Sequence, residues 1–191
     1  MSTEFQIDEL LRWAYMYPRP VATHKGNLQG ESVIVYSDGG CRPNPGVGAI
    51  GVCITHMNIP VLKAAYTLGP EHCTNNVAEY LAAMVGIAWA GELVSPGGTV
   101  HLQTDSKLVS SQIDQDDTAT NPHMIQLRRM VLTQIRLLAE LGTKVTVARI
   151  PRELNTQADD LVNSAFEGRE EAALLLHYSP PRVVKHVVRR Y

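Results

Sequence analysis

The sequence has few cysteines, little net charge and no long apolar run, and each shortage excludes a class of protein. Three cysteines among 191 residues, with no C-x-x-C pair, match neither a zinc site nor the disulfide framework of a small secreted domain. A formal net charge of −2 gives no strong overall field, so a polyanionic partner would have to be held by a local basic patch. No apolar run approaches the roughly 20 residues of a membrane span.

The N-terminal residues do not resemble a targeting signal. Glu4, Asp8 and Glu9 are acidic, whereas a signal or transit peptide is basic and poor in acids. Together with the cysteine usage, this predicts an intracellular protein, cytoplasmic or nuclear, with no signal peptide and no membrane contact. Hydrophobic residues make up 45% of the chain, enough for one domain with a core. The oligomeric state is left open.

The first strong signal is an apolar run, Val33 to Tyr36, followed by Ser37, Asp38 and the glycines Gly39 and Gly40. Four β-prone residues between turn signals predict a buried central strand. A buried strand has no local reason to end on an acid, so we interpret Asp38 as a residue with a chemical task. On this segment alone, a hairpin turn at Asp38-Gly39 is an equal alternative.

The next section predicts an antiparallel meander and then a buried helix. Residues 47–56 and 59–68 predict two strands, and residues 74–93 predict a helix. From residue 77 to residue 91 that helix carries one charge, Glu79, and a helix that is apolar nearly all round is a buried one. Buried Glu79 either pairs with something positive or stabilises the helix N-terminus from the first turn.

A second strand also ends on an acid. Residues 99–104 alternate as a strand, and Asp105 follows at once. Because a helix separates this strand from the first meander, a right-handed crossover places it parallel to the strand before Asp38. Asp38 and Asp105 then lie at the carboxyl edge of the sheet, where open α/β sheets bind ligands. This repetition favours a site over a turn.

The last elements of the pattern add a fourth acid. Residues 144–150 predict a strand and residues 155–166 a helix capped by Asn155. On a helical wheel Asp159 lies at the border of the apolar face, whereas Asp160 points away from it. Asp159 is therefore the candidate for a site and Asp160 the solvent residue.

Four carboxylates thus come from four separated segments: Asp38, Glu79, Asp105 and Asp159. Clustered acids repel one another and raise each other's pKa, so such a cluster persists mainly by binding hard cations. Oxygen ligands suit Mg²⁺ or Mn²⁺. The familiar use of such a set is a two-metal site, with ions about 3.5–4 Å apart, that hydrolyses a phosphodiester.

Five motifs occur in an order and at spacings that resemble type 1 ribonuclease H over residues 32–167. They are Tyr36-Ser37-Asp38-Gly39-Gly40-Cys41, Asn44-Pro45-Gly46, Thr74-Asn75-Asn76-Val77-Ala78-Glu79, Thr104-Asp105-Ser106 and Pro151-Arg152-Glu153-x-Asn155-x-x-Ala158-Asp159. The resemblance implies the ribonuclease H-like α/β fold, a mixed five-stranded sheet of order 3-2-1-4-5 with strand 2 antiparallel, flanked by helices.

The resemblance also implies the activity and its residues. The four acids match the family's catalytic metal ligands, with two Mg²⁺ or Mn²⁺ ions. The reaction is endonucleolytic hydrolysis of the RNA strand of an RNA/DNA hybrid, leaving 5′-phosphate and 3′-hydroxyl ends. Positions matching contacts to the hybrid are Gly39, Gly40, Cys41, Asn44 and Asn75, with Ser106 as a weaker match. Sensing the 2′-hydroxyl distinguishes RNA from DNA.

Two features depart from many family members. The loop before the last acid, residues 149–153, has no histidine; it resembles the arginine-loop branch known from archaeal and plant relatives, with Arg152 as first choice for the replacement and Arg149 as second. A salt bridge to a neighbouring acid is an equal alternative for Arg152. The basic, tryptophan-rich handle is missing, because residues 112–123 form a short acidic connection.

The resemblance divides the chain into three parts. Residues 31–167 form the catalytic domain, preceded by an N-terminal helix (3–17) and linker within residues 1–30. Residues 168–191 form a basic tail with a short helix around residues 170–176. The basic groups of this tail, which could hold a polyanion or be merely solvated, are Arg182, Lys185, His186, Arg189 and Arg190.

Two alternatives to the hybrid-cleaving enzyme stay open at this stage. One is a relative that also or mainly cuts double-stranded RNA, and the other is a nucleic-acid-binding module that has lost catalysis. The presence of all four acids disfavours the second.

Overall fold

A six-stranded mixed sheet forms the centre of the computed structural model, which describes residues 28–114, 121–169 and 171–174. The strands are β1 (Ser32–Arg42), β2 (Gly46–His56), β3 (Ile59–Cys73), β4 (Thr99–Thr104), β5 (Lys144–Arg149) and β6 (Glu171–Leu174). The helices are α2 (Asn75–Val94), α3 (Lys107–Asp114), α4 (Pro122–Glu140) and α5 (Thr156–Phe166), with a short 3₁₀ helix, η1, at Arg152–Leu154.

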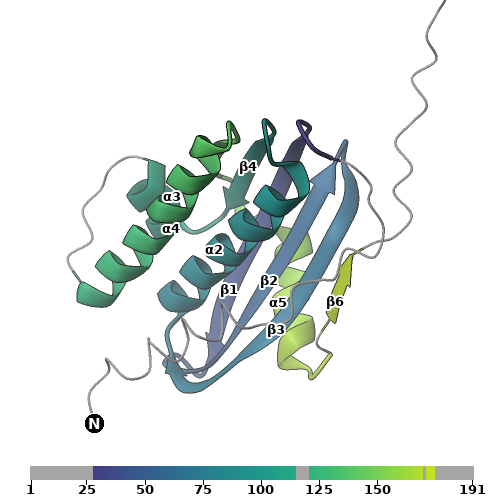
Figure 1. Ribbon diagram of the computed structural model, residues 1–191. Helices are drawn as coiled ribbons and strands as arrows, with labels where there is room; N and C mark the ends of the chain where they lie inside the picture. The colour runs from purple at the N-terminus through teal and green to yellow at the C-terminus, as the bar shows by residue number, and fades with distance from the viewer. Residues whose placement is uncertain (1–27, 115–120, 170, 175–191) are drawn as a thin grey trace, which may run out of the picture.

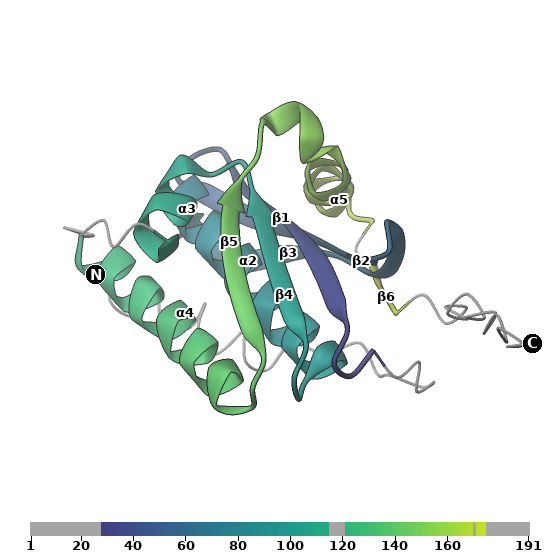
Figure 2. The same ribbon diagram turned by 90° about the horizontal axis from the view of Figure 1, so that it is seen from above.

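The sheet order is β5-β4-β1-β2-β3-β6. Strand β1 pairs parallel with β4 and β4 parallel with β5, whereas β1, β2 and β3 form an antiparallel meander. Figure 1 shows the central strands behind α2, and Figure 2 shows α5 on the opposite face of the sheet from α2, α3 and α4. The predicted five strands, their order 3-2-1-4-5 and the flanking helices are confirmed.

Strand β1 does not end at Asp38, and the hairpin-turn interpretation of Asp38-Gly39 is wrong. The strand continues to Arg42, because its second half pairs with β2, where Asp38 lies opposite Gly51. Its parallel pairing with β4 stops one residue earlier, at Ser37 and Thr104. Asp38 therefore lies immediately beyond the point where β4 ends, on a strand held from one side.

The C-terminal side of the sheet differs from the sequence-based expectation. The predicted helix around residues 170–176 is wrong for residues 171–174, which form β6 and pair antiparallel with β3. An open edge of β3 would leave backbone groups unpaired, and β6 covers part of it. Strand β6 therefore extends the sheet past residue 167, the predicted end of the catalytic domain.

Strand β3 is also longer than predicted, running through Pro70 to Cys73. Leu68 pairs with Gly48 of β2 and Cys73 pairs with Gly46, so the register shifts between these two pairs. Pro70 lies in the irregular stretch between them. Because no regular pair forms there, the missing N–H of proline breaks no ladder hydrogen bond. The predicted helix at residues 3–17 and the basic groups from Arg182 onward lie outside the described residues.

Helix α2 is the core helix. By length and composition it could cross a membrane, but 78% of its most apolar window is buried inside the protein. It begins at the cap residue Thr74, whose hydroxyl accepts from the Val77 N–H at 3.4 Å. The prediction of a helix packed between the sheet and other helices is confirmed, with α4 and α3 on its outer side.

Two glycines let helices from opposite faces approach the sheet beside Asp38. A Cβ atom built on Gly39 would lie 2.2 Å from the backbone carbon of Ala78 in α2. One built on Gly51, the partner of Asp38 across the ladder, would lie 2.3 Å from the backbone oxygen of Ala158 in α5. Side chains at these positions would push away the two helices that carry Glu79 and Asp159.

We therefore expect Gly39→Ala to destabilise the fold by about 3 kcal/mol or more, because its methyl group meets backbone and not a movable side chain. Urea denaturation followed by circular dichroism measures the change. Gly40→Ala is the matched control, since a Cβ there has ordinary contacts at 3.7 Å with Phe166 and Val162. Equal stability of the two variants would contradict this account of the packing.

Candidate active site

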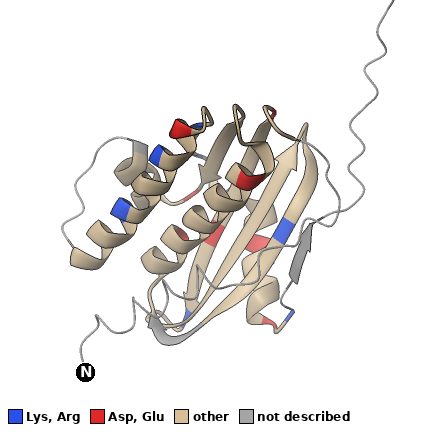
Figure 3. Ribbon diagram, viewed as in Figure 1, with Lys and Arg blue, Asp and Glu red and all other residues tan. Residues whose placement is uncertain are grey.

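The four predicted acids converge at the carboxyl ends of the parallel strands. Asp38 lies on β1 beyond the end of β4, and Asp105 follows β4 directly. Glu79 comes from the beginning of α2 on one face, and Asp159 from α5 on the other. Asp38 interacts electrostatically with all three of the other acids. Figure 3 shows acidic positions on β1 and α2, whereas basic positions lie along α4.

Burial and mutual repulsion act on the carboxyl groups at the centre. Burial, followed by the charge of Asp105, raises the pKa of Asp38 to about 7, although the Gly39 backbone opposes the rise. Burial also raises the pKa of Glu79, while the hydrogen bond from Ser106 acts in the opposite direction. Glu79 is outside the first turn of α2, which contains no acid, so the alternative of a helix-terminus partner is wrong.

Neutral hydrogen-bond donors hold two of the acids. The hydroxyl of Ser106 donates a hydrogen bond to Glu79 Oε2. The amide of Asn155 donates to Asp105 Oδ1 at 2.7 Å and to the Ser37 carbonyl at 3.0 Å. Both donors are buried, Ser106 with 6% and Asn155 with 1% of its surface exposed. The carboxylates are therefore oriented without being neutralised.

Asn155 departs from its predicted task. It occupies the position before α5, yet its side chain makes no capping hydrogen bond to the helix. Its nitrogen donates to Asp105 and Ser37 instead, and its buried Oδ1 has no hydrogen-bond partner among the residues that the structure describes. Sequence reasoning identified Asn155 only as a cap and a motif residue, because a contact across 50 residues leaves no local signal.

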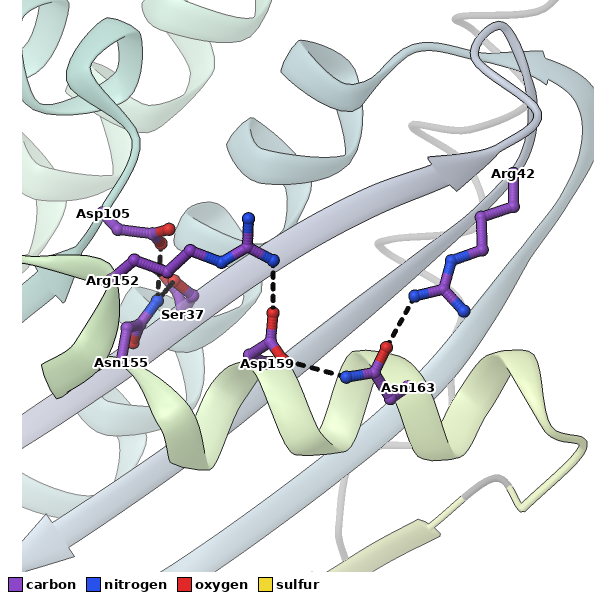
Figure 4. Close-up of polar contacts among 7 residues, drawn as sticks. All are labelled: Ser37, Arg42, Asp105, Arg152, Asn155, Asp159 and Asn163. Carbon is purple, nitrogen blue, oxygen red and sulfur yellow. Dashed lines mark hydrogen bonds and ion pairs between the residues drawn. The ribbon is translucent and has the colours of Figure 1, made fainter.

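Asp159 is held on both oxygens (Figure 4). Arg152 Nη2 contacts Oδ1 at 2.9 Å, and Asn163 Nδ2 donates to Oδ2 at 2.9 Å. Arg152 is 76% exposed, and its bond to Asp159 raises its pKa. Arg149 instead donates from Nε to the backbone oxygen of Asp105. Of the two arginines, Arg152 is thus the one bonded to a site carboxylate, and Asp160 is exposed as predicted.

Three of the predicted hybrid-contacting residues form a hydrogen-bond network at the start of α2. The Cys41 N–H donates to Asn75 Oδ1 at 2.8 Å, and the Asn75 N–H donates to Asn44 Oδ1 at 3.3 Å. Both asparagine side chains are exposed, whereas Gly39 and Cys41 are buried and offer backbone only. Ser106 is also buried and bonded to Glu79, which favours a positioning task; its predicted contact with nucleic acid stays a prediction.

The donor set fits a hard divalent cation. All four acids provide oxygen, and burial together with the charges of the other three acids already raises the pKa of Asp38. Among the described residues, no three His, Cys, Asp or Glu side chains are close enough to hold one ion as they stand. A cation would therefore have to draw the carboxylates together and compete with Arg152 for Asp159.

Comparison with known proteins agrees with this geometry. The RNase H family model matches residues 30–167. The Mycobacterium tuberculosis bifunctional protein Rv2228c is 30% identical over 141 residues, which cover 74% of this chain and 37% of that protein. The solved N-terminal RNase H domain of Rv2228c has a TM-score of 0.63, 26% identity, and coverage of 72% of this chain and 95% of its own.

Two further proteins are similar to this chain to a comparable degree. Ribonuclease HI of Halobacterium salinarum is 31% identical over 140 residues, covering 73% of this chain and 66% of that protein. The structure of LC11-RNase H1, isolated from compost, in complex with an RNA/DNA hybrid has a TM-score of 0.59 and 30% identity, covering 71% of this chain and 97% of its own. The chain belongs to the RNase H family, and the resemblance seen in the motifs is confirmed.

We predict that Asp38→Asn stabilises the metal-free protein at neutral pH. The folded-state pKa of about 7 exceeds the ordinary 3.8, so between these values the folded chain binds more protons than the unfolded chain, and stability falls as pH rises. Removing the charge should recover on the order of 4 kcal/mol at pH 8 and little near pH 4. Thermal melting in chelator measures the gain.

Asp160→Asn, which removes an exposed charge from the neighbouring helix, is the control for this experiment. A lower melting temperature of Asp38→Asn than of wild type at pH 8 without metal would contradict the conclusion that burial and repulsion destabilise the charged form of Asp38.

Proposed function

We propose that this chain is a divalent-metal-dependent endonuclease that hydrolyses the RNA strand of RNA/DNA hybrids, leaving 5′-phosphate and 3′-hydroxyl ends. The observation that carries the proposal is the convergence of Asp38, Glu79, Asp105 and Asp159 on one edge of an RNase H-family sheet. Because the chain covers 37% of the length of Rv2228c, the proposal concerns this domain and not the activity of a longer relative.

The metal ligands in this proposal are the four acids, and the ions are two Mg²⁺ or Mn²⁺. Such a pair supplies a nucleophilic water and offsets the charge that develops on the leaving oxygen. Within the chain, Ser106 fixes Glu79 and Asn155 fixes Asp105, so these two carboxylates meet the cations in set orientations.

Recognition of the hybrid is assigned to the network around the start of α2. Asn44 and Asn75 are exposed and tied to each other and to the Cys41 backbone, so they present a preorganised polar surface. Gly39 and Gly40 precede Cys41 on β1, and their backbone is assigned to the same contact. The 2′-hydroxyl, both donor and acceptor, is the group by which such a surface distinguishes RNA from DNA. LC11-RNase H1, which shares this fold, is described with an RNA/DNA hybrid.

Arg152 is assigned a part in turnover, in the place of the loop histidine found in many relatives. Its side chain is exposed and bonded to Asp159 through a single nitrogen, Nη2, so it is able to leave that carboxylate when a cation arrives. A guanidinium released in this way can bind a phosphate oxygen. We expect Arg152→Ala to lower kcat without abolishing cleavage, whereas loss of a metal ligand abolishes it.

The test is cleavage of an end-labelled RNA/DNA hybrid beside double-stranded and single-stranded RNA, with Mg²⁺ and with Mn²⁺. Wild type should cut the hybrid selectively. Asp105→Asn should reduce cleavage to background, because the asparagine side chain has nearly the same shape but lacks the carboxylate that binds metal. Asp160→Asn, an exposed charge in α5, should cut like wild type.

Each other result of this assay has a definite meaning. Preferred cleavage of double-stranded RNA would replace the substrate in the proposal. Binding of the hybrid without cleavage under either metal would support a binding module. Full activity of Asp105→Asn would contradict the assignment of the site.

A further inference from the structure

Asp159 belongs to a row of four polar side chains, Arg152, Asp159, Asn163 and Arg42, that are bonded in this order (Figure 4). Asn163 donates from Nδ2 to Asp159 Oδ2 at 2.9 Å and accepts at Oδ1 from Arg42 Nη2 at 2.6 Å. Arg152 occupies the other carboxylate oxygen. Arg42 comes from the end of β1, 121 residues away in sequence, so the contact joins α5 to the strand that carries Asp38.

The hydrogen-bonding chemistry of Arg42 and Asp159 determines the orientation of the Asn163 amide between them. A guanidinium only donates hydrogen bonds, and an ionised carboxylate only accepts them. Asn163 therefore satisfies both neighbours in one orientation, with its oxygen toward Arg42 and its nitrogen toward Asp159. Arg42 itself lies over the ring of Phe166, with its guanidinium carbon 4.4 Å from the ring centroid, which limits its freedom.

From this geometry we propose that Asn163 is a positioning residue for Asp159 and that Arg42 acts through it, so that the pair presets one oxygen of Asp159 for metal binding. The proposal rests on the assignment of Asp159 as a metal ligand under the proposed function. It adds two residues, Asn163 and Arg42, that the motif resemblance did not include.

The two partners of Asp159 differ in what they do to a cation. Arg152 is itself cationic and largely exposed, so it competes with a metal ion for the carboxylate. Asn163 is neutral and half-buried, and its hydrogen bond leaves the charge of Asp159 intact. Asn163 can therefore keep its contact when the ion is bound, which is the usual task of a residue that orients a metal ligand. Arg42 is kept one amide away from the carboxylate and so does not neutralise it.

The first test is calorimetric titration of the full chain with MnCl₂, without nucleic acid. Asn163→Leu keeps the side-chain size but cannot donate to Asp159, and we expect it to raise the Mn²⁺ dissociation constant about tenfold. Arg42→Ala should act in the same direction by a smaller factor. Arg129→Ala, which removes an exposed arginine on α4, is the charge-matched control and should bind Mn²⁺ like wild type.

The second test is the double variant Arg42→Ala/Asn163→Leu. If Arg42 acts through the amide, its removal changes nothing once Asn163 is leucine, so the double variant should match Asn163→Leu within about twofold. If Arg42→Ala weakens Mn²⁺ binding as much in the Asn163→Leu variant as in wild type, Arg42 does not act through Asn163, and the proposal is overturned. If Arg42 only held the hybrid, Arg42→Ala would raise KM and leave the Mn²⁺ affinity unchanged. This result would also overturn the proposal.

A purely structural role for Asn163 predicts a different pattern. It would lower the melting temperature in chelator but leave the Mn²⁺ dissociation constant of the folded protein within about twofold of wild type, and this result would overturn the proposal. Asp159→Asn separates failure of the proposed metal site from failure of the positioning role of Asn163. If Asp159→Asn binds Mn²⁺ and cuts the hybrid like wild type, the proposed site is wrong; if it loses both while Asn163→Leu loses neither, only the positioning role is wrong.

Discussion

The site depends on the close approach of two helices to the strand that carries Asp38. Gly39 gives α2 backbone contact with one face, and Gly51, opposite Asp38 on β2, gives α5 the same contact with the other. Because both contacts are to backbone atoms, the position of each helix is set by main-chain geometry and not by adaptable side chains. Glu79 and Asp159 reach the centre of the sheet as a consequence, where Asp38 and Asp105 already lie at the ends of parallel strands.

Bringing four acids together costs free energy, and the neutral residues that bond to them do not offset this cost. Ser106, Asn155 and Asn163 orient Glu79, Asp105 and Asp159 with neutral donors, and the site keeps its negative charge. Arg152 is a cation bonded to one of the acids, and it is exposed. Burial, followed by the charge of Asp105, raises the pKa of Asp38, so part of this rise comes from repulsion that remains among the acids. A divalent cation relieves this repulsion, which links the stability of the metal-free fold to the affinity of the site.

The sequence predicted the elements and the acids better than their surroundings. Strand and helix periodicity, together with the rule for parallel crossovers, located Asp38 and Asp105 at one edge, and the helical wheel separated Asp159 from Asp160 correctly. The spacing of four residues between Asp159 and Asn163 on one helix was a readable signal for that contact. Arg42 and Asn155 were not readable as partners, because their bonds span 121 and 50 residues and depend on the packing of α5.

The failed predictions have a common physical origin in sheet pairing. Asp38-Gly39 resembles a turn locally, yet β2 provides a partner that keeps both residues extended. Residues 171–174 have a helical composition, but they pair with β3. In both cases a long-range partner overrides the local preference, which is how tertiary context usually changes strand and helix propensities.

The most direct test of the central claim is anomalous diffraction from crystals of this chain grown with an RNA/DNA hybrid and Mn²⁺. The account predicts Mn²⁺ bound by Asp38 together with the other three acids, Asn163 still bonded to Asp159, and Arg152 displaced from it. A hybrid bound at this edge of the sheet with the Arg152–Asp159 pair intact and no Mn²⁺ beside Asp38 would contradict it.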